Sequence, residues 1–497
     1  MAAEPRGPEV SETHISTLFF TGDRAYKLLK PVRTSFLDHT TVEQRLHAVD
    51  EEIALNRRMA ADVYLGSANV VEHGQLVDRM LVMRRLPSDR RLTDLIERNA
   101  AIDDCVRSIA RQVAVFHAAE PPAPDAADTA GVGAIATNWH DNFADLTPLR
   151  QEVIPPEDFD RAGELVDRYL GGRESLFRHR IDRGFVRDGH GDLTAQDIFC
   201  LEDGPRILDC LAFDRRLRVG DVLLDVAFLA MDLDRLAGSD TARSFLDWYG
   251  EFSNERHPWS LAHHYVAYRA SVRAKVAAIR HGQGDPTAAE RVLGYHRQCL
   301  RHLERGAVML TIVGGLPGTG KSTLAQRLAD PLDAMVLCTD DLRKDLAGRG
   351  HLDRDLSPVG TGIYGAEHTE RTYRELLDRA RTLLERGESV ILDASWNRSA
   401  YREKARLLAA DTTADFVELE CVLDAETARD RIVARLERGT DSSDARPELL
   451  EQLRRQHEPW NSATRVNTKA DPDAATAEVL NAEPMYTRRF GDSGSSW

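Results

Sequence analysis

The sequence has few cysteines, and none of them are closely paired. Its six cysteines contain no C-x-x-C pair and stand at positions 105, 200, 210, 299, 338 and 421. This pattern favours small buried thiols in a reducing compartment over disulfides or zinc ligands. We therefore predict a protein without disulfides or structural zinc.

Long apolar runs and a positive charge balance are also missing. No apolar run approaches the roughly 20 residues that a membrane-spanning helix needs, and the start MAAEPRGPEVSE has neither a basic beginning nor an apolar core. The net charge of −16 disfavours non-specific binding to nucleic acid or to an anionic membrane. We expect a cytoplasmic protein that binds no membrane, and the charge disfavours nucleic acid as a partner without excluding it.

The composition is that of a soluble globular protein, with 42% hydrophobic and 29% charged residues. A chain of 497 residues is too long for one ordinary core, so two or three domains are expected. The clearest motif lies at 307–323, where a β-branched apolar run is followed by a match to G-x-x-x-x-G-K-[ST]. Its predicted nucleotide-binding residues are Gly315, Pro317, Gly318, Thr319, Gly320, Lys321, Ser322 and Thr323.

The residue types of this motif suit a phosphate-binding loop. Glycines let backbone N–H groups curl around phosphate oxygens, and the helix predicted from Thr323 directs its positive dipole end at the nucleotide. Lys321 would reach the β- and γ-phosphates, and the Ser322 hydroxyl would ligate Mg²⁺. The motif predicts an ATP and Mg²⁺ site.

Strands alternate with helices after this loop, which predicts an α/β domain with a parallel sheet. Asp340 and Asp393 end two of its strands and should meet at the carboxyl edge of the sheet. Asp340 would accept a proton from an acceptor hydroxyl, and Arg343 would hold an anionic acceptor. Arg435 and Arg438 would close over the transferred phosphoryl group as a lid, although surface charge is the alternative for these arginines.

This half, about 306–462, resembles the small P-loop kinases of the gluconate kinase, zeta-toxin and polynucleotide 5′-hydroxyl kinase group. The resemblance implies that Asp340 is the general base and that Arg343 binds substrate. It also matches Asp393 to an acidic residue at a strand end and the stretch SSDA (442–445) to the lid. The loop motif is shared far more widely, so it does not select the acceptor.

The N-terminal part begins with residues 1–12, which we expect to be mobile, and continues with a small sheet and one helix. ISTLFF and AYKLLKPV are expected strands, and 43–61 has helical spacing. Lys27 on the second strand and Glu52 or Glu51 on the helix could form the ion pair that holds phosphates in protein-kinase-like lobes. On these residues alone, a solvated charge pair fits better.

A second group of carboxylates lies in VRDGHGDLTAQDIFCLEDGPRILDCLAFD (186–214). Asp192, Asp197 and Asp209 follow the order in which one carboxylate accepts a hydroxyl proton and two oxygen ligands hold Mg²⁺. Turn capping and surface exposure explain the same spacing, so the residues alone leave both interpretations open. Asp221 and Asp225, on an apolar helix, are better explained by capping and structural hydrogen bonds.

HGDLTAQDI, ILDCLAFD and VGDVLLDVAFLAMDLD resemble the catalytic core of aminoglycoside phosphotransferases and of choline- or fructosamine-kinase-like enzymes, over about 14–285. This resemblance implies a catalytic base at Asp192, metal ligands at Asp197 and Asp209, and a phosphate-pairing lysine at Lys27. Two features depart from the family: Asp197 stands where Asn is usual, and no G-x-G-x-x-G precedes Lys27.

The expected fold is a two-lobed α+β protein-kinase-like domain followed by an α/β P-loop kinase domain with a parallel sheet. Its parts are an N-lobe at 1–87, a C-lobe at 88–285, a connecting helix at 286–305, the P-loop domain at 306–470 and a disordered tail at 471–497. Together the halves resemble proteins described as aminoglycoside-phosphotransferase-like and ATP-binding fusions.

The leading hypothesis is a bifunctional ATP- and Mg²⁺-dependent kinase that phosphorylates a hydroxyl on a small polar acceptor. One alternative is a polynucleotide 5′-hydroxyl kinase. The other is a nucleotide-sensing regulatory protein with a degenerate N-terminal kinase domain.

Overall fold

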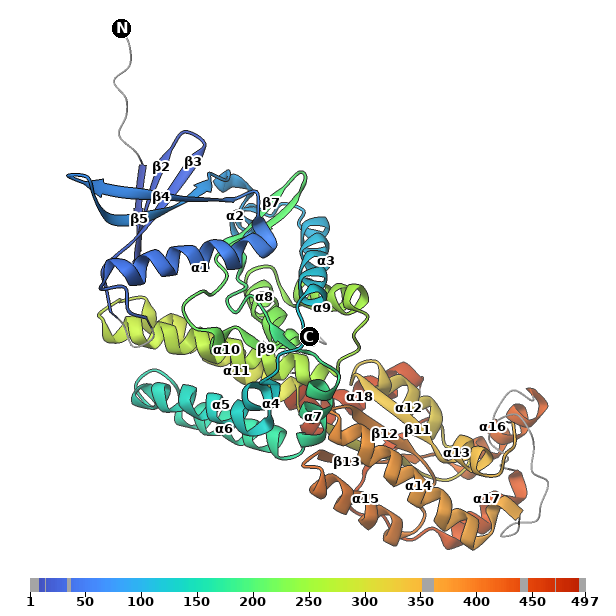
Figure 1. The fold of residues 1–497 in the computed structure, drawn as a ribbon. Coiled ribbons are helices and arrows are strands. Elements are labelled where there is room, and N and C mark those ends of the chain that lie inside the picture. Colours follow the sequence, from blue (N-terminus) through green and yellow to red (C-terminus); the bar gives the residue numbers. More distant parts are fainter. Residues whose placement is uncertain are drawn as a thin grey trace.

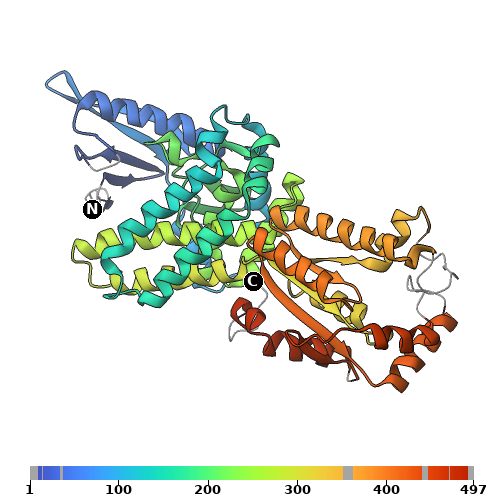
Figure 2. The same cartoon turned by 90° about the horizontal axis from the view of Figure 1, so that it is seen from below.

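The computed structural model describes residues 9–13, 15–33, 37–350, 362–438, 446–469 and 471–490. They form a small N-lobe, a helical C-lobe and an α/β P-loop domain. Figures 1 and 2 show the N-lobe and the P-loop domain at opposite ends of the molecule, with the C-lobe between them. In the described part of the chain, no helix is long and apolar enough to cross a membrane.

The N-lobe is a five-stranded antiparallel sheet in the order β1-β2-β3-β5-β4, covered by α1 (Val42–Ala60). Ala25, Val49 and Leu81 are buried between the sheet and the helix. The strands are β1 (Glu9–Glu12), β2 (Ser16–Thr21), β3 (Arg24–Leu29), β4 (Tyr64–Glu72) and β5 (Gln75–Arg84). The expectation that residues 1–12 are mobile is wrong for β1, because this strand pairs with β2.

The start of α1 is fixed by a capping box. The Gln44 amide donates to the Thr41 hydroxyl at 3.2 Å, and the Thr41 amide donates to the Gln44 side-chain oxygen at 3.0 Å. The helix then buries Glu52 and Asn56 on the side that faces the C-lobe loops described below.

The C-lobe is mainly helical, with two short antiparallel strand pairs, β6–β9 and β7–β8, that carry the predicted catalytic segment. Its core includes Trp139, Phe228 and Tyr265. α11, in the predicted connecting segment, packs along α10 and so forms part of this lobe. Its longer helices are α3 (Asp103–Ala119), α5 (Val132–Leu146), α6 (Pro156–Gly171), α7 (Glu174–Asp182), α8 (Val222–Leu236), α9 (Ser239–Ser253), α10 (Trp259–Gly282) and α11 (Ala288–Arg305). The short elements are η1 (Ser88–Arg90), α2 (Leu92–Glu97), α4 (Ala126–Ala130), η2 (Thr147–Leu149), η3 (Ala195–Asp197), η4 (Arg215–Leu217), β6 (Val186–Asp188), β7 (Ile198–Leu201), β8 (Gly204–Ile207) and β9 (Val219–Asp221).

The P-loop domain contains the predicted parallel sheet. Its strand order is β11-β12-β10-β13-β14, and every neighbouring pair is parallel. The strands are β10 (Met309–Gly314), β11 (Ala334–Cys338), β12 (Ser389–Asp393), β13 (Asp415–Val422) and β14 (Thr464–Asn467). The connecting elements are α12 (Lys321–Ala329), α13 (Thr339–Leu346), η5 (Gly362–Tyr364), α14 (Ala366–Glu385), α15 (Ser399–Asp411), α16 (Ala425–Arg438) and α17 (Pro447–Gln456).

The predicted disordered tail is instead mostly helical, which corrects the expectation for 471–497. α18 (Pro472–Ala482) begins at Asp471, whose carboxylate accepts from two amides of the first turn, and α19 (Pro484–Phe490) follows. The Tyr486 side chain is fully buried, and its hydroxyl lies 2.8 Å from the Thr311 hydroxyl of β10. The tail is therefore ordered by burial against the sheet, while 491–497 lie outside the described residues.

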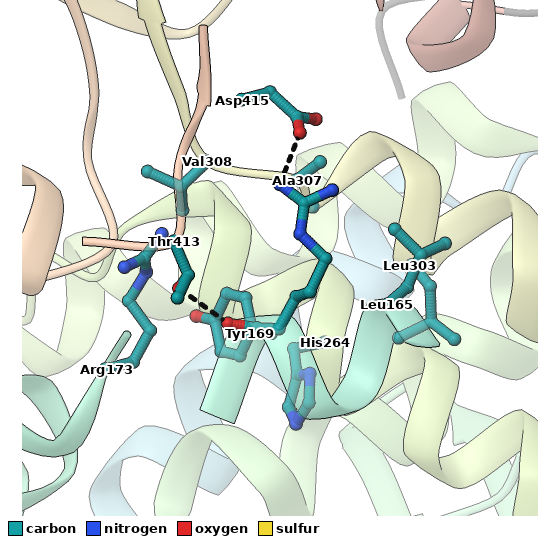
Figure 3. A pocket seen from close by; sticks show the side chains of 11 residues that line it. Leu165, Tyr169, Arg173, His264, Leu303, Ala307, Val308, Thr413 and Asp415 are labelled. Carbon is teal, nitrogen blue, oxygen red and sulfur yellow. Dashed lines mark hydrogen bonds and ion pairs between the residues drawn. The ribbon is translucent and has the colours of Figure 1, made fainter. Parts of the chain in front are cut away.

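The C-lobe packs against the amino ends of the parallel strands. Arg168 of α6 forms a 2.6 Å ion pair with Asp415 at the start of β13, and Ser260 of α10 donates to the Gly387 carbonyl just before β12. Figure 3 shows this contact, where Tyr169, Arg173 and His264 face Thr413 and Asp415 around a cavity of about 20 Å³. That volume holds about one water molecule. The interface leaves the carboxyl edge of the sheet open.

Cys105 of α3 and Cys200 of β7 form a disulfide, which contradicts the prediction of six free thiols. The two cysteines are 95 residues apart in the sequence, but packing brings their Cα atoms to 6.0 Å, within the usual range for a bridge. Cys210, Cys299 and Cys421 are buried thiols, and Cys338 is partly exposed. With this disulfide present, the cysteines no longer support the prediction that the protein resides in a reducing compartment.

Alkylation of the unfolded, unreduced protein should therefore label four cysteines, and reduction should raise the number to six. Replacing Cys105 and Cys200 together by serine should lower the free energy of unfolding by about 2–4 kcal/mol, because the bridge closes a long loop. Mass spectrometry and thermal melting measure these effects. Reductant should lower the melting temperature of the natural chain but not of the double variant. Labelling of six cysteines without reductant would contradict the bridge.

Candidate active sites

The phosphate-binding loop links β10 to α12 in a conformation that requires glycine. Gly315 and Gly318 have φ values of +133° and +80°. A Cβ atom would lie 2.5 Å from the Cys421 carbonyl oxygen at the first position and 2.4 Å from the Ala428 carbonyl oxygen at the second. Other side chains are thus excluded by contact as well as by conformation. The predicted residues from Gly315 to Thr323 all lie on this loop or on the first turn of α12, where helix amides are open to an anion.

Two side chains of the loop contact its own backbone. Lys321 Nζ donates to the Leu316 carbonyl at 3.1 Å, and the buried Thr319 hydroxyl donates to the same carbonyl at 2.8 Å. The Lys321 ammonium therefore lies within the curl of the loop. This is where a lysine can meet phosphate oxygens.

Asp393 ends β12 directly beside this loop, as the sequence predicts. It pairs in register with Val313 of β10 and Cys338 of β11, and it is 4% exposed. Burial raises the pKa of Asp393, while Lys321 and a hydrogen bond with the Ser322 hydroxyl oppose that rise. The carboxylate is thus positioned against both the lysine and the hydroxyl of the motif.

Asp340 and Arg343 lie on α13, which begins at the carboxyl end of β11. Arg343 Nη1 is 3.4 Å from the Asp340 carboxylate, and its guanidinium carbon lies 4.5 Å from the centre of the Tyr364 ring. Arg343 is 8% exposed, and its Nε has no hydrogen-bond partner among the described residues. No sequence motif marks Tyr364, because its contact with Arg343 on α13 forms only through tertiary packing.

The predicted lid is only partly described. Arg435 is half-buried on α16, whereas the Arg438 side chain and SSDA (442–445) lie outside the described residues. Arg431 on the same helix was missed by the sequence reasoning. Its Nη2 donates to the Thr468 carbonyl at 2.8 Å, and the Thr468 hydroxyl donates to the Thr319 carbonyl at 2.6 Å. The sequence feature that could have identified Arg431 is its position four residues before Arg435, which places both arginines on one face of a helix.

In the N-lobe, Lys27 contacts two carboxylates. Its Nζ is 2.8 Å from Glu52 and 3.1 Å from Asp209, and the Lys27 and Glu52 side chains are 14% and 10% exposed. Glu51 is exposed and faces His47, so the structure selects Glu52. Burial disfavours the charged lysine, but Asp209 and Glu52 outweigh it and hold the pKa of Lys27 well above its usual value. Lys27 in turn lowers the pKa of Asp209. The solvated pair favoured on the residues alone is therefore wrong.

Asp192 and Asp197 lie on the loop between β6 and β7. Burial raises the pKa of Asp192 to about 6, and burial together with Asp209 raises that of Asp197 to about 7. The Thr194 hydroxyl donates to Asp197 at 2.8 Å. Carboxylates whose pKa is raised by burial and by a neighbouring negative charge are typical of sites that bind a cation or transfer a proton.

Asp225 and Asp221 have the structural roles that the sequence favoured. Asp225 accepts the His190 and Gly191 amides at 2.7 and 2.8 Å, and it lies 3.0 Å from His117 Nε2. Asp221 caps α8 by accepting the Leu223 amide. Asp225 therefore fixes the backbone immediately before Asp192.

Helix α1 also holds the loops of the C-lobe, which the sequence reasoning missed. Asn56 accepts the Cys210 amide at 2.8 Å, next to Asp209, and Arg58 donates to the Gly189 carbonyl at 3.1 Å. One helix thus positions Lys27, through Glu52, together with the loops of Asp192 and Asp209.

Both sites fit a magnesium nucleotide by the chemistry of their side chains. The P-loop site offers a glycine cradle, Lys321, the Ser322 hydroxyl and Asp393, and the N-terminal site offers Lys27 with the carboxylates of Asp197 and Asp209. Within the described ranges, no three His, Cys, Asp or Glu residues cluster as metal ligands. Mg²⁺ is commonly held by one or two carboxylates together with substrate phosphates.

The family model described as an AAA domain matches residues 310–460. Three proteins described as uncharacterized, one from Mycobacterium bovis and two from strains of Mycobacterium tuberculosis, are each 40% identical to the chain over 475 residues. Each alignment covers 95% of this chain and 95% of the relative, so the similarity includes both halves.

The solved structures similar to parts of the chain include kinases. A choline/ethanolamine kinase family protein from Mesorhizobium loti is 14% identical and covers 61% of this chain and 90% of its own, with a TM-score of 0.39. The APS kinase of Mycobacterium tuberculosis, solved with AMPPNP and APS, is 23% identical and covers 35% and 96%, with a TM-score of 0.26. A gluconokinase from Sinorhizobium meliloti is 17% identical and covers 35% and 90%, with a TM-score of 0.26.

Replacing Asp225 by asparagine should lower the free energy of unfolding by roughly 1–3 kcal/mol, because buried donors lose their charged acceptor. Hydrogen bonding with His117 and with the His190 amide outweighs burial and holds the pKa of Asp225 below its usual range. Because the pKa of Asp225 is lower in the folded chain than in the unfolded chain, where it is about 3.9, the ionised carboxylate stabilises the fold above about pH 3.9. This stabilisation is lost as the pH falls from about 3.9 through the pKa of the folded state.

Urea unfolding at neutral and acidic pH measures this effect. The difference between the natural chain and Asp225→Asn should shrink in acid. Asp240→Asn, an exposed change on α9, should have little effect at either pH. Equal stability of Asp225→Asn and the natural chain at neutral pH would show that Asp225 does not hold the loop.

Proposed function

We propose that the chain, which belongs to the same family as the three mycobacterial proteins over both of its halves, is a two-site, ATP-dependent phosphotransferase. It moves the γ-phosphate of ATP to a hydroxyl of a small polar acceptor. The convergence of the glycine loop, Lys321, Asp340 and Asp393 at one edge of the P-loop sheet carries this proposal.

The roles at the P-loop site follow from these positions. Bound ATP with Mg²⁺ supplies the transferable phosphoryl group and a charge that stabilises it. Lys321 and the loop amides bind the phosphates, and Ser322 and Asp393 hold the cation. Asp340 takes the proton of the acceptor hydroxyl. Arg343, whose Nε has no hydrogen-bond partner among the described residues, binds an acidic group of the acceptor.

The N-terminal site is proposed to be active as well. Lys27, oriented by Glu52, binds phosphates, Asp197 and Asp209 hold Mg²⁺, and Asp192 is the base. The buried Lys27–Glu52 pair and the anchoring of both catalytic loops support an active site over a degenerate one.

A small acceptor in the cytoplasm is part of the same proposal, because ATP and Mg²⁺ are available there. The net charge of −16 favours a small molecule over a polynucleotide with a 5′-hydroxyl. Phosphorylation of an oligonucleotide with a 5′-hydroxyl in preference to metabolites would instead favour a polynucleotide kinase.

Replacing Asp340 by asparagine should lower kcat for acceptor phosphorylation by 10²–10⁴-fold, because a positioned base contributes about that much. The assay is ADP release with a metabolite library in an Asp192→Asn background, which leaves only the P-loop site. Asp330→Asn, an exposed change of the same kind after α12, is the control and should retain activity. A loss of less than about tenfold for Asp340→Asn would exclude Asp340 as the base.

A further inference from the structure

The hairpin β7–β8 carries both carboxylates that are proposed to hold the cation of the N-terminal site. Asp197 directly precedes β7, and Asp209 follows the last residue of β8 by two positions. The Leu208 amide donates to the Asp197 carbonyl at 3.0 Å, which closes the open end of the hairpin. The placement of this hairpin therefore decides how the two carboxylates lie relative to each other and to a bound nucleotide.

The hairpin has little support of its own. It forms a sheet of two strands only, and each strand has four residues. A two-stranded hairpin is at best marginally stable by itself. Ile198 and Ile207, a pair at its base, are buried in the core of the C-lobe. The remainder of the hairpin depends on contacts with neighbouring segments.

The disulfide is one of these contacts, and it is attached within β7. Cys200, the third residue of the strand, is bonded to Cys105 of α3. The Cys200 carbonyl accepts from Arg90 Nε at 2.7 Å, and the Arg91 guanidinium carbon lies 5.1 Å from the centre of the Phe199 ring. Both arginines belong to the segment that joins the N-lobe to the C-lobe. The bridge thus holds β7 between α3 and the connection of the two lobes.

The two sulfur-bearing residues differ in exposure. Cys200 is 4% exposed, whereas Cys105 is half-buried and its helix neighbours Asp104 and Ser108 are exposed. A reagent therefore reaches the bridge from the side of Cys105. In the cytoplasm, where the protein is proposed to act, reductants keep most thiols reduced, and the disulfides that form there are usually transient and redox-sensing. Exposure and compartment together favour a reversible bridge over a permanent one.

We infer that the Cys105–Cys200 bridge is a thiol–disulfide exchange site for a dithiol reductant. The bridge controls the order of the β7–β8 hairpin and, through Asp197 and Asp209, the affinity of the N-terminal site for a magnesium nucleotide. The effect on nucleotide binding rests on the proposed function. The bridged chain binds the nucleotide more tightly, because reduction releases β7 from α3. Burial of Ile198 and Ile207 keeps the reduced lobe folded.

The exchange requires only the two thiols of the reductant. One of them, as a thiolate, attacks Cys105 Sγ to form a mixed disulfide, while the bond between the two cysteines breaks and Cys200 leaves as a thiolate that takes up a proton. The second thiolate of the reductant then attacks its own sulfur in the mixed disulfide, and Cys105 leaves and takes up a proton. The reductant ends as a disulfide, and the bridge ends as two thiols.

The test uses the full-length chain with Lys321→Ala, so that nucleotide binds only at the N-terminal site, and dithiothreitol as the dithiol. Acid quenching, unfolding and alkylation, followed by mass spectrometry, report whether the bridge was reduced while the chain was folded. Hydrogen exchange of the β7 and β8 amides reports the order of the hairpin. Calorimetry with Mg²⁺ and a non-hydrolysable ATP analogue reports the affinity.

Dithiothreitol should reduce the bridge in the folded chain, speed hairpin exchange by about fivefold or more, and weaken nucleotide binding by about threefold or more. The double variant Cys105→Ser, Cys200→Ser should match the reduced chain with or without dithiothreitol. Cys338→Ser, which changes a partly exposed thiol outside the bridge, should keep the response.

A bridge that resists dithiothreitol in the folded chain would overturn the inference. Unchanged hairpin exchange after reduction, equal nucleotide affinity of the bridged and reduced chains, or the same response in the double variant would also overturn it. Faster hairpin exchange in a chain that binds no nucleotide in either state would uphold the control of the hairpin and contradict only the proposed function of the N-terminal site.

Discussion

The burial of the amino ends of the parallel strands against the C-lobe decides where chemistry can occur in the P-loop domain. Arg173, buried in the C-lobe, donates to the Thr412 carbonyl before β13 at 2.7 Å, and the Thr413 hydroxyl donates back to the Arg168 carbonyl. Gly172 and Gly387 lie so close to the opposing domain that a Cβ atom would clash. Only the opposite, carboxyl edge is free of the C-lobe, and that edge carries the phosphate loop.

This arrangement separates the two candidate sites. The N-terminal site lies between the N-lobe and the C-lobe. Helix α16, against which Gly318 of the phosphate loop packs, lies toward the far end of the molecule (Figure 1). The helices of the C-lobe and the whole sheet stand between them. A product of one site would therefore pass through solvent to reach the other, and each site would bind its own nucleotide.

The sequence was most informative where a function depends on adjacent residues. The phosphate loop is one continuous motif with fixed backbone demands, and Asp340 and Asp393 could be placed together because parallel strands end at one edge. The sequence made Lys27 and Glu52 candidates. Choosing Glu52 over Glu51 required the structure, which shows where α1 begins and which of its side chains face Lys27. The resemblance to known families, rather than spacing, identified Asp192, Asp197 and Asp209.

Features that depend on packing between distant segments could not be predicted. Cys105 and Cys200 carry no signal of their bridge, because α3 and β7 meet only in the folded C-lobe. The tail reads as polar and Ala-rich, and its helices are ordered by the burial of Tyr486 and the contact of Arg489 with the Ala307 carbonyl. Arg431 and Asn56 likewise acquire partners only through tertiary structure.

Calorimetric titration of the full-length chain with Mg²⁺ and a non-hydrolysable ATP analogue tests the central claim of two separate nucleotide sites. The account predicts two bound nucleotides, with Lys321→Ala removing one and Lys27→Ala removing the other without changing the affinity of the site that remains. Binding of one nucleotide or none by the natural chain, or the loss of both through a single one of these changes, would contradict it.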